Sequence, residues 1–254
     1  MKQVLVQVIS VLLAGLASSA VLAQAVDYSK LSNEERQKIA AITEVWQQVP
    51  VVKADAGKAP SDAINLLDLS QWQAVGSKAP AGWELKDGVL TVKPGAGDIE
   101  SKQAFCDVQL HMEWRTPTDI AGKTGQQRNN SGVFLQSRYE VQVLDSYNNP
   151  TYSNGQAGSV YKQTSPLVNA SRAPGEWQSY DIIYNAPRFN GNKLTSPGFV
   201  TVLHNGVLVQ NHTQILGNTE WIGAPSYTAH GCLPLKLQDH GNPISFRNLW
   251  VREL

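Results

Sequence analysis

Short runs in which apolar and polar residues alternate dominate the chain from about residue 64 onward. Gly, Pro, Asn and Asp, the residues that favour turns, separate these runs. Alternation with a period of two predicts β-strands, because successive side chains of a strand point to opposite faces of its sheet. Many short strands with frequent turn signals predict an all-β fold built as an antiparallel sandwich or barrel. The clearest runs are residues 88–92, 107–115, 131–136, 139–145, 179–184, 198–212 and 243–254.

The run at residues 107–115 divides its side chains between two faces. One face carries His111, Glu113 and Arg115, and two interpretations of them are open. They could simply point at water, or they could line a polar groove that binds a ligand. The other face is apolar and is expected to enter the core; it consists of Val108, Leu110, Met112 and Trp114.

The run at residues 139–145 places a carboxylate and a carboxamide in an otherwise apolar strand. Tyr139, Val141 and Val143 face one way, whereas Glu140 and Gln142 face the other. Such polar groups are costly to bury unless they are hydrogen-bonded. The pattern therefore favours a concave polar groove.

Two further polar clusters could flank such a groove. The segment QQRNNSG, residues 126–132, offers amide and guanidinium donors beside a turn, and LQDHGNP, residues 237–243, precedes the final strand. Asn, Asp and Gly also stabilise loops that bind nothing, and this alternative stays open. The candidate substrate-binding or catalytic residues of the two clusters are Asn130, Gln238, Asp239 and His240.

A helix is predicted over residues 32–49. Ser32 and Glu35 form a capping box at its start, and Pro50 stops it. We expect this helix to pack on the outside of the sandwich as a brace and residues 51–63 to form a connecting loop. Its apolar face consists of Ile39, Ile42, Val45 and Trp46.

Two loop regions are predicted inside the β-rich part. Asn205-Gly206 lies between two alternating runs and predicts a hairpin turn, because these residues tolerate the positive φ that such turns require. Residues 146–178 are rich in Ser, Asn, Gly and Pro, and we expect them to form loops over one end of the sandwich.

The amino-terminal segment has the layout of a secretory signal peptide. Lys2 precedes an apolar stretch, and small residues follow it. We expect cleavage after Ala25, with Ala23 or Ala20 as alternatives, and a mature protein in the periplasm or outside the cell. The apolar stretch is too short to span a membrane comfortably, and no cysteine near the cleavage site could carry a lipid anchor. The expected organisation is a signal peptide at 1–25, a helix and loop at 26–63, and one β-sandwich domain at 64–254.

Charge and cysteine content exclude some classes of function and leave one question open. The chain has 21 basic and 21 acidic residues without a basic block, so neither nucleic acid nor an anionic membrane is an expected partner. No phosphate-binding glycine loop, nucleophile elbow or helical zinc-type His pair occurs. Cys106 and Cys232 could form a disulfide in an oxidising compartment or remain two buried thiols.

Several segments follow one another in one order and at natural spacing: GWELKDGVL at 82–90, GDIESKQAFCDVQLHMEWR at 97–115, NNSGVFLQ at 129–136, YEVQVLDS at 139–146, GSVYKQTSPLVNASRAPGEWQSYDI at 158–182, VTVLHNGVLVQNH at 200–212, and GCLPLKLQDHGNPISFRNLWVREL at 231–254. Together they resemble the 3-keto-disaccharide hydrolase family. The resemblance implies a concanavalin-like jelly-roll sandwich, of the kind found in lectins and laminarinase-type glucanases, with a sugar-binding groove on one concave sheet. It implies a carbohydrate substrate.

Conventional glycoside hydrolysis needs two carboxyl groups beside the scissile bond. Laminarinase-type enzymes place such groups at alternate positions of one strand, whereas this chain has Glu140 followed by Gln142. A carboxamide cannot exchange a proton usefully, so the strand lacks the pair. Glu113 or Asp239 could complete a pair from elsewhere in the fold.

A 3-keto sugar changes the requirement, because its ketone acidifies the hydrogen on C2. One base can then remove that proton while hydrogen-bond donors stabilise the enolate, and the C1 substituent leaves by elimination. Glu140 is the candidate base, and His240 is the candidate acid for the leaving oxygen. No cofactor is required, although a divalent ion would also stabilise the enolate. The candidate donors are Gln142, Asn130, His111 and Arg115.

Two alternatives of different classes remain at this stage. A lectin-like module would use the same groove to bind a glycan without turning it over. A structural partner in an envelope assembly would use the loops at residues 146–178 as its interface and would bind no sugar.

Overall fold

The structure is a computed structural model that describes residues 27–254. The expected signal peptide lies outside the described residues, so export stays a prediction. The chain divides into two units, the first ending at Val51 and the second comprising Val52–Leu254. Within residues 27–254, no helix has the length and apolar character needed to cross a membrane.

The predicted capping box opens the one α-helix of the described residues, α2 (Asn33–Ala40). The Glu35 backbone N–H donates to Ser32 Oγ at 3.2 Å, and the Ser32 backbone N–H donates to Glu35 Oε2 at 2.9 Å. Short 3₁₀ turns flank the helix, η1 (Tyr28–Lys30) and η2 (Ala41–Thr43).

The helix is shorter than predicted: helical structure ends at Thr43, six residues before the predicted end at residue 49. The following residues include the β-branched Val45 and Val49, which lower helix propensity, and Pro50 disfavours helical geometry in the residue before it. No residue of α2 is buried. The expected bracing contact therefore stays a prediction.

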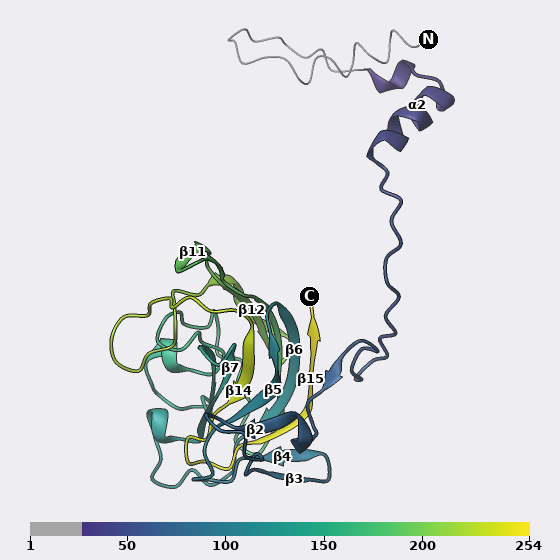
Figure 1. The fold of residues 1–254 in the computed structure, drawn as a ribbon. Helices are drawn as coiled ribbons and strands as arrows, with labels where there is room; N and C mark the ends of the chain where they lie inside the picture. The colour runs from purple at the N-terminus through teal and green to yellow at the C-terminus, as the bar shows by residue number, and fades with distance from the viewer. Residues whose placement is uncertain (1–26) are drawn as a thin grey trace. The chain divides into compact units, whose positions relative to one another are not determined.

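The second unit is an antiparallel β-sandwich of the jelly-roll type, as predicted (Figure 1). Its larger sheet contains, in spatial order, β13 (Val207–Gln214), β12 (Phe199–His204), β9 (Gln178–Asn185), β6 (Val108–Arg115), β15 (Ser245–Glu253), β4 (Val89–Thr91) and β3 (Glu84–Lys86), with β1 (Ile64–Asn65) paired to β15. Its smaller sheet contains β2 (Trp72–Ala74), β5 (Ile99–Phe105), β14 (Leu233–Leu237), β7 (Asn130–Leu135) and β8 (Tyr139–Leu144). A separate hairpin is formed by β10 (Arg188–Asn190) and β11 (Lys193–Ser196), and 3₁₀ turns occur at η3 (Leu69–Gln71), η4 (Gly125–Gln127) and η5 (Ser153–Gly155).

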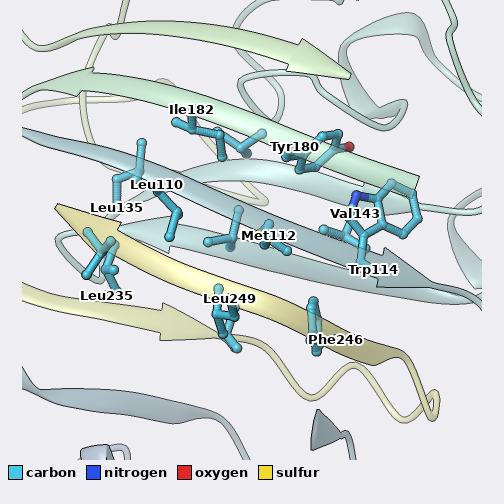
Figure 2. Close-up of a cluster of buried hydrophobic side chains, with 14 of the residues drawn as sticks. Leu110, Met112, Trp114, Leu135, Val143, Tyr180, Ile182, Leu235, Phe246 and Leu249 are labelled. Carbon is cyan, nitrogen blue, oxygen red and sulfur yellow. The ribbon is translucent and has the colours of Figure 1, made fainter. Parts of the chain in front are cut away.

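The core lies between the two sheets, and strand alternation fills it from both sides (Figure 2). Strand β6 alternates strictly, with every second side chain fully buried, so the predicted apolar face of residues 107–115 is confirmed. Trp114 of β6 packs against Tyr180 of β9 with their ring centroids 5.3 Å apart. From the smaller sheet, Tyr139, Val141 and Val143 of β8 enter the same core, again as predicted.

The structure confirms one local prediction and decides one alternative that the sequence left open. Asn205 and Gly206 connect β12 to β13 with φ values of 53° and 77°, the positive φ expected for this hairpin turn. Cys106 and Cys232 are joined in a disulfide, which settles the alternative of two free thiols. The disulfide links the end of β5 to the start of β14, two neighbouring strands of the smaller sheet.

Candidate functional site

A cavity of about 630 Å³ lies on the outer face of the smaller sheet. Its floor comes from β7 and β8, and its walls come from the segments that cross over these strands. The residues that line it are Gln126, Gln127, Asn130, Phe134, Glu140, Gln142, Tyr152, Tyr161, Thr219, Trp221, Gln238 and His240.

Strand register explains why the floor residues meet. Phe134 of β7 pairs with Glu140 of β8, and Gly132 pairs with Gln142 two residues along. Because residues two apart share a face, Glu140 and Gln142 point away from the core together, as predicted. The same alternation brings Asn130 to this face. Both strands are nevertheless buried along their whole length, since covering segments close over the outer face.

Glu140 is the one carboxylic acid among the described residues that line the cavity, and its acidity is strongly perturbed. Only 4% of its surface is exposed, and burial raises the pKa of its carboxyl group to about 8. The positive charge of Lys236 opposes this rise, and the negative charge of Asp98 adds to it. The Lys236 ammonium group already has two other partners. Its Nζ atom lies 3.1 Å from Asp98 Oδ2 and 3.7 Å from the centroid of the Phe134 ring. Near neutral pH, Glu140 therefore exchanges its proton easily, as a general acid or base must.

Neighbouring groups hold Glu140 at both its backbone and its side chain. The Glu140 backbone N–H donates to Thr219 Oγ1 at 2.9 Å. With the Gln142 carboxamide nitrogen turned toward it, that nitrogen donates to Glu140 Oε1 and to the Ser131 carbonyl oxygen, each at 2.9 Å. These contacts leave the carboxyl group little freedom to move, which favours a defined position for proton transfer.

Gly132 leaves the space that the Glu140 carboxyl group occupies. A Cβ atom on Gly132 would lie 2.9 Å from Glu140 Cδ and equally close to a ring carbon of Phe134. We therefore expect Gly132→Ala to push the carboxyl group out of position and to lower activity by about 10- to 100-fold. Steady-state kinetics on a folded variant, verified by circular dichroism, would measure the loss.

Gly231→Ala is the matched control for this substitution, because a Cβ there meets no atom within 4 Å and the residue does not need a positive φ. It should keep wild-type activity. Full activity in the Gly132 variant would show that the position of the Glu140 carboxyl group is unimportant.

Amide side chains form one cluster in the cavity lining. Gln126 Nε2 donates to the Gly155 carbonyl oxygen at 2.8 Å, and Asn130 Nδ2 donates to the Gln126 carbonyl oxygen at 2.9 Å. Arg128, in the same segment, does not line the cavity. Its Nε donates to Asp145 Oδ2 at 2.8 Å in a buried ion pair. The amides of residues 126–132 thus reach the site, whereas the guanidinium has a structural role.

The segment after β14 contributes two of its three predicted residues to the cavity. Gln238 lines the wall, and its Oε1 atom has no hydrogen-bond partner among the described residues. His240 lines the cavity as an exposed side chain. Asp239 does not line it, because its carboxylate accepts from the backbone N–H groups of Gly97 at 3.0 Å and Gly241 at 2.9 Å.

The structure places His111, Glu113 and Arg115 on the outer face of the larger sheet, away from this cavity. There, His111 Nδ1 lies 2.6 Å from Asp181 Oδ1, and Arg247 Nε donates to Glu113 Oε2 at 2.7 Å. The Arg115 guanidinium stacks over Trp177 at 4.6 Å. The prediction that they join Glu140 in one groove is therefore corrected, because β6 and β8 belong to different sheets.

Several lining residues were not anticipated from the sequence. Tyr152 and Tyr161 come from the long segment after β8, and Thr219 and Trp221 come from the segment between β13 and β14. Neither segment has a regular hydrophobic period, so neither gives a signal of orientation. Among residues 27–254, no group of three or more His, Cys, Asp or Glu side chains is placed to hold a metal ion.

The fold and the cavity together define a jelly-roll β-sandwich with a ligand cavity on its smaller sheet and one buried carboxyl group in that cavity. Residues 62–252 match the 3-keto-alpha-glucoside-1,2-lyase-like domain, and the chain belongs to this family. It is 22% identical to the 3-keto-disaccharide hydrolase of Bacteroides thetaiotaomicron over 274 residues, covering 88% of this chain and 90% of that protein.

Two crystal structures from Parabacteroides distasonis ATCC 8503, each described as a "putative glycosyl hydrolase", share this fold. The first is 53% identical with a TM-score of 0.79, covering 84% of this chain and 96% of that chain. The second is 20% identical with a TM-score of 0.53, covering 74% of this chain and 90% of that chain, and supports the fold alone. The family match, the curated relative and the first of these structures support a carbohydrate hydrolase class for this chain.

Proposed function

We propose that this protein cleaves 3-keto glycosides in the cavity on its smaller sheet, with Glu140 as the base. One observation carries the proposal: in the described part of the chain, Glu140 is the one carboxyl group that lines the cavity, and burial raises its pKa to about 8. Membership of the lyase-like family and the similarity to a 3-keto-disaccharide hydrolase support the same substrate class.

The proposed reaction begins with removal of the C2 proton of the sugar, which is acidic because the ketone lies at C3. The electron pair of the C2–H bond forms an enolate whose negative charge rests on the C3 oxygen. That enolate then expels the C1 substituent, and a C1–C2 double bond forms as the C3 ketone returns. Addition of water across the double bond, with OH at C1 and H at C2, completes a net hydrolysis.

Each step has a candidate group in the cavity. Ionised Glu140 takes the C2 proton, and its raised pKa gives a strong enough base near physiological pH. Carboxamide N–H groups of Asn130 and Gln238 can donate to the enolate oxygen, where charge develops, while both N–H groups of Gln142 hold Glu140 and the Ser131 carbonyl oxygen. His240, an exposed residue of the cavity lining, can protonate the leaving oxygen.

Conventional hydrolysis receives less support from the same cavity. It needs a second carboxyl group about 5–9.5 Å from the first. Of the two candidates from the sequence, Glu113 lies on the opposite sheet bonded to Arg247, and Asp239 caps a turn. A lectin-like module remains the second candidate function, because a binding protein could use the same cavity without turnover.

The proposal includes export. Residues 1–25 carry the pattern of a signal peptide, and the disulfide between Cys106 and Cys232 suits an oxidising compartment such as the periplasm.

The test is incubation of the purified mature protein with a 3-keto disaccharide and, separately, with its unoxidised parent, with and without chelator. Nuclear magnetic resonance would follow the products. We expect cleavage of the keto sugar alone, with exchange of the C2 hydrogen for solvent deuterium. Saturable binding without any product would favour the lectin-like module, and cleavage of the parent sugar would favour conventional hydrolysis.

A further inference from the structure

The cavity changes character from its floor to its mouth. The floor residues Asn130, Glu140 and Gln142 are polar and at most 4% exposed. The mouth carries the aromatic rings of Tyr152 and Trp221, which are 42% and 71% exposed. A ligand that enters therefore meets hydrogen-bonding groups at its buried end and aromatic faces at its outer end.

Trp221 has an anchored backbone although its ring is exposed. The Lys162 ammonium group donates to the Trp221 carbonyl oxygen at 2.8 Å. Two residues earlier, Thr219 accepts from the Glu140 backbone N–H and donates its own N–H to the Arg138 carbonyl oxygen at 2.8 Å. The segment that carries the indole ring is thus tied directly to the strand that carries the base.

The two tyrosines of the cavity lining are also held in place. The Tyr152 and Tyr161 hydroxyl groups lie 2.7 Å apart, and the Lys162 ammonium group lies 5.8 Å from the Tyr152 ring centroid. Gly155 packs directly against the Tyr152 ring, since a Cβ there would lie 2.8 Å from Tyr152 Cζ. Lys162 adopts a φ of 56°, an unfavourable conformation for a non-glycine residue that tends to occur at functional sites.

Trp221 is exposed and at the same time lines the cavity, so its indole face is available to a ligand that enters. Aromatic faces stack well on flat or apolar ring faces. The cavity volume falls in the range of about 300–1,000 Å³ that is typical of small-ligand sites, and it suits a disaccharide.

We propose that the aromatic rim formed by Tyr152, Tyr161 and Trp221 binds the leaving group of the substrate. That group is a ring with an apolar face, either a second pyranose or an aromatic aglycone. The polar floor then holds the terminal keto sugar beside Glu140, so the protein acts on terminal residues that carry a cyclic leaving group. This inference rests on the proposed function for the reaction, but the ring-binding site is defined by the rim alone.

The test compares Trp221→Ala and Trp221→Phe with wild type on three 3-keto glucosides that differ at C1: methyl, phenyl and glucosyl. We expect Trp221→Ala to lower kcat/KM by about 10- to 100-fold on the phenyl and glucosyl substrates, mainly through KM, and by less than about 2-fold on the methyl substrate. Trp221→Phe should retain most of the activity. If Trp221→Ala lowers kcat/KM on only one of the phenyl and glucosyl substrates, that result would identify the kind of leaving group that the protein binds.

Ile222→Ala is the matched control, because this neighbouring side chain is 75% exposed and does not line the cavity. It should behave as wild type on all three substrates. Equal losses on all substrates in Trp221→Ala, or none, would overturn the inference.

A binding measurement separates this inference from the proposed chemistry. Calorimetry with the unoxidised phenyl, glucosyl and methyl glucosides should give tighter binding of the two cyclic compounds, lost in Trp221→Ala. That result supports the aromatic rim even if no keto sugar is turned over, which would overturn the proposed reaction. Equal affinity, or no binding, for all three compounds would overturn the rim as a ring-binding site.

Discussion

Glu140→Gln is expected to lower turnover of a 3-keto glycoside by about 10²- to 10⁴-fold while the protein stays folded. Gln has the shape of Glu but cannot accept the C2 proton. The substitution removes no apolar surface from the core, because Glu140 points away from it into the cavity. Steady-state rates with methyl and glucosyl substrates would measure the effect, and wild-type turnover in the variant would exclude Glu140 as the base.

The same substitution should change how stability depends on pH. The folded-state pKa of Glu140 is about 8, above the ordinary value of 4.5, because burial penalises the ionised form. The raised pKa of Glu140 therefore contributes fully to the free energy of unfolding below about pH 4.5. This contribution of Glu140 is lost as the pH rises through 8. Wild type should lose roughly 3–5 kcal/mol over that window relative to Glu140→Gln.

Urea unfolding of both proteins at several pH values between 4 and 9.5 would measure the difference directly. Other carboxyl groups titrate in both proteins and cancel when the two curves are subtracted. The catalytic rate should depend on pH in the opposite direction to stability, since the ionised base accumulates as pH rises toward 8 and above. Parallel stability curves for the two proteins would show that Glu140 ionises normally in the folded state.

Removal of the disulfide should cause the largest loss of stability. Cys106 and Cys232 are 126 residues apart, so their bond restricts a large part of the unfolded chain. Loop-closure entropy for a loop of this size predicts a loss of about 3–5 kcal/mol in the Cys106→Ser, Cys232→Ser double variant. Urea unfolding with and without reductant would measure the loss.

The double variant supplies its own control for this prediction, because reductant should destabilise wild type but leave the variant unchanged. The disulfide also ends the segment that carries Thr219 and Trp221, since Cys232 lies directly before β14. We therefore expect KM for cyclic leaving groups to rise in the variant. Equal stability of oxidised and reduced wild type would show that the bond does not contribute.

Alternation along the strands predicted much of the fold, because it depends on neighbouring residues. It assigned Val108 and Tyr139 to the core and Glu140 to the opposite face, and the structure confirms each assignment. The Asn205-Gly206 hairpin turn was also predicted correctly, because its signal likewise comes from neighbouring residues. The predicted helix extended too far, because the apolar spacing of Ile42, Val45 and Trp46 continues past the point where the backbone stops being helical.

Alternation does not reveal which sheet a strand joins, and that limited the prediction of the site. His111 and Glu140 have similar patterns around them but lie on outer faces of different sheets. The wall of the cavity depends on contacts between residues that are distant in sequence. One example is the hydrogen bond from the Glu140 backbone N–H to Thr219 Oγ1, 79 positions away. Trp221 was not predicted for the same reason, since its position is set by Lys162 and not by its neighbours in sequence.

The covalent bond between Cys106 and Cys232 has a further consequence for how the protein would respond to proteolysis. Every residue that lines the cavity, except Gln238 and His240, lies between the two cysteines. A protease that cut once at an exposed position in this interval, such as Leu167, would leave both pieces joined through the bond. The nicked protein would separate on a gel only after reduction, and the β-sheets could hold the cavity together after the cut.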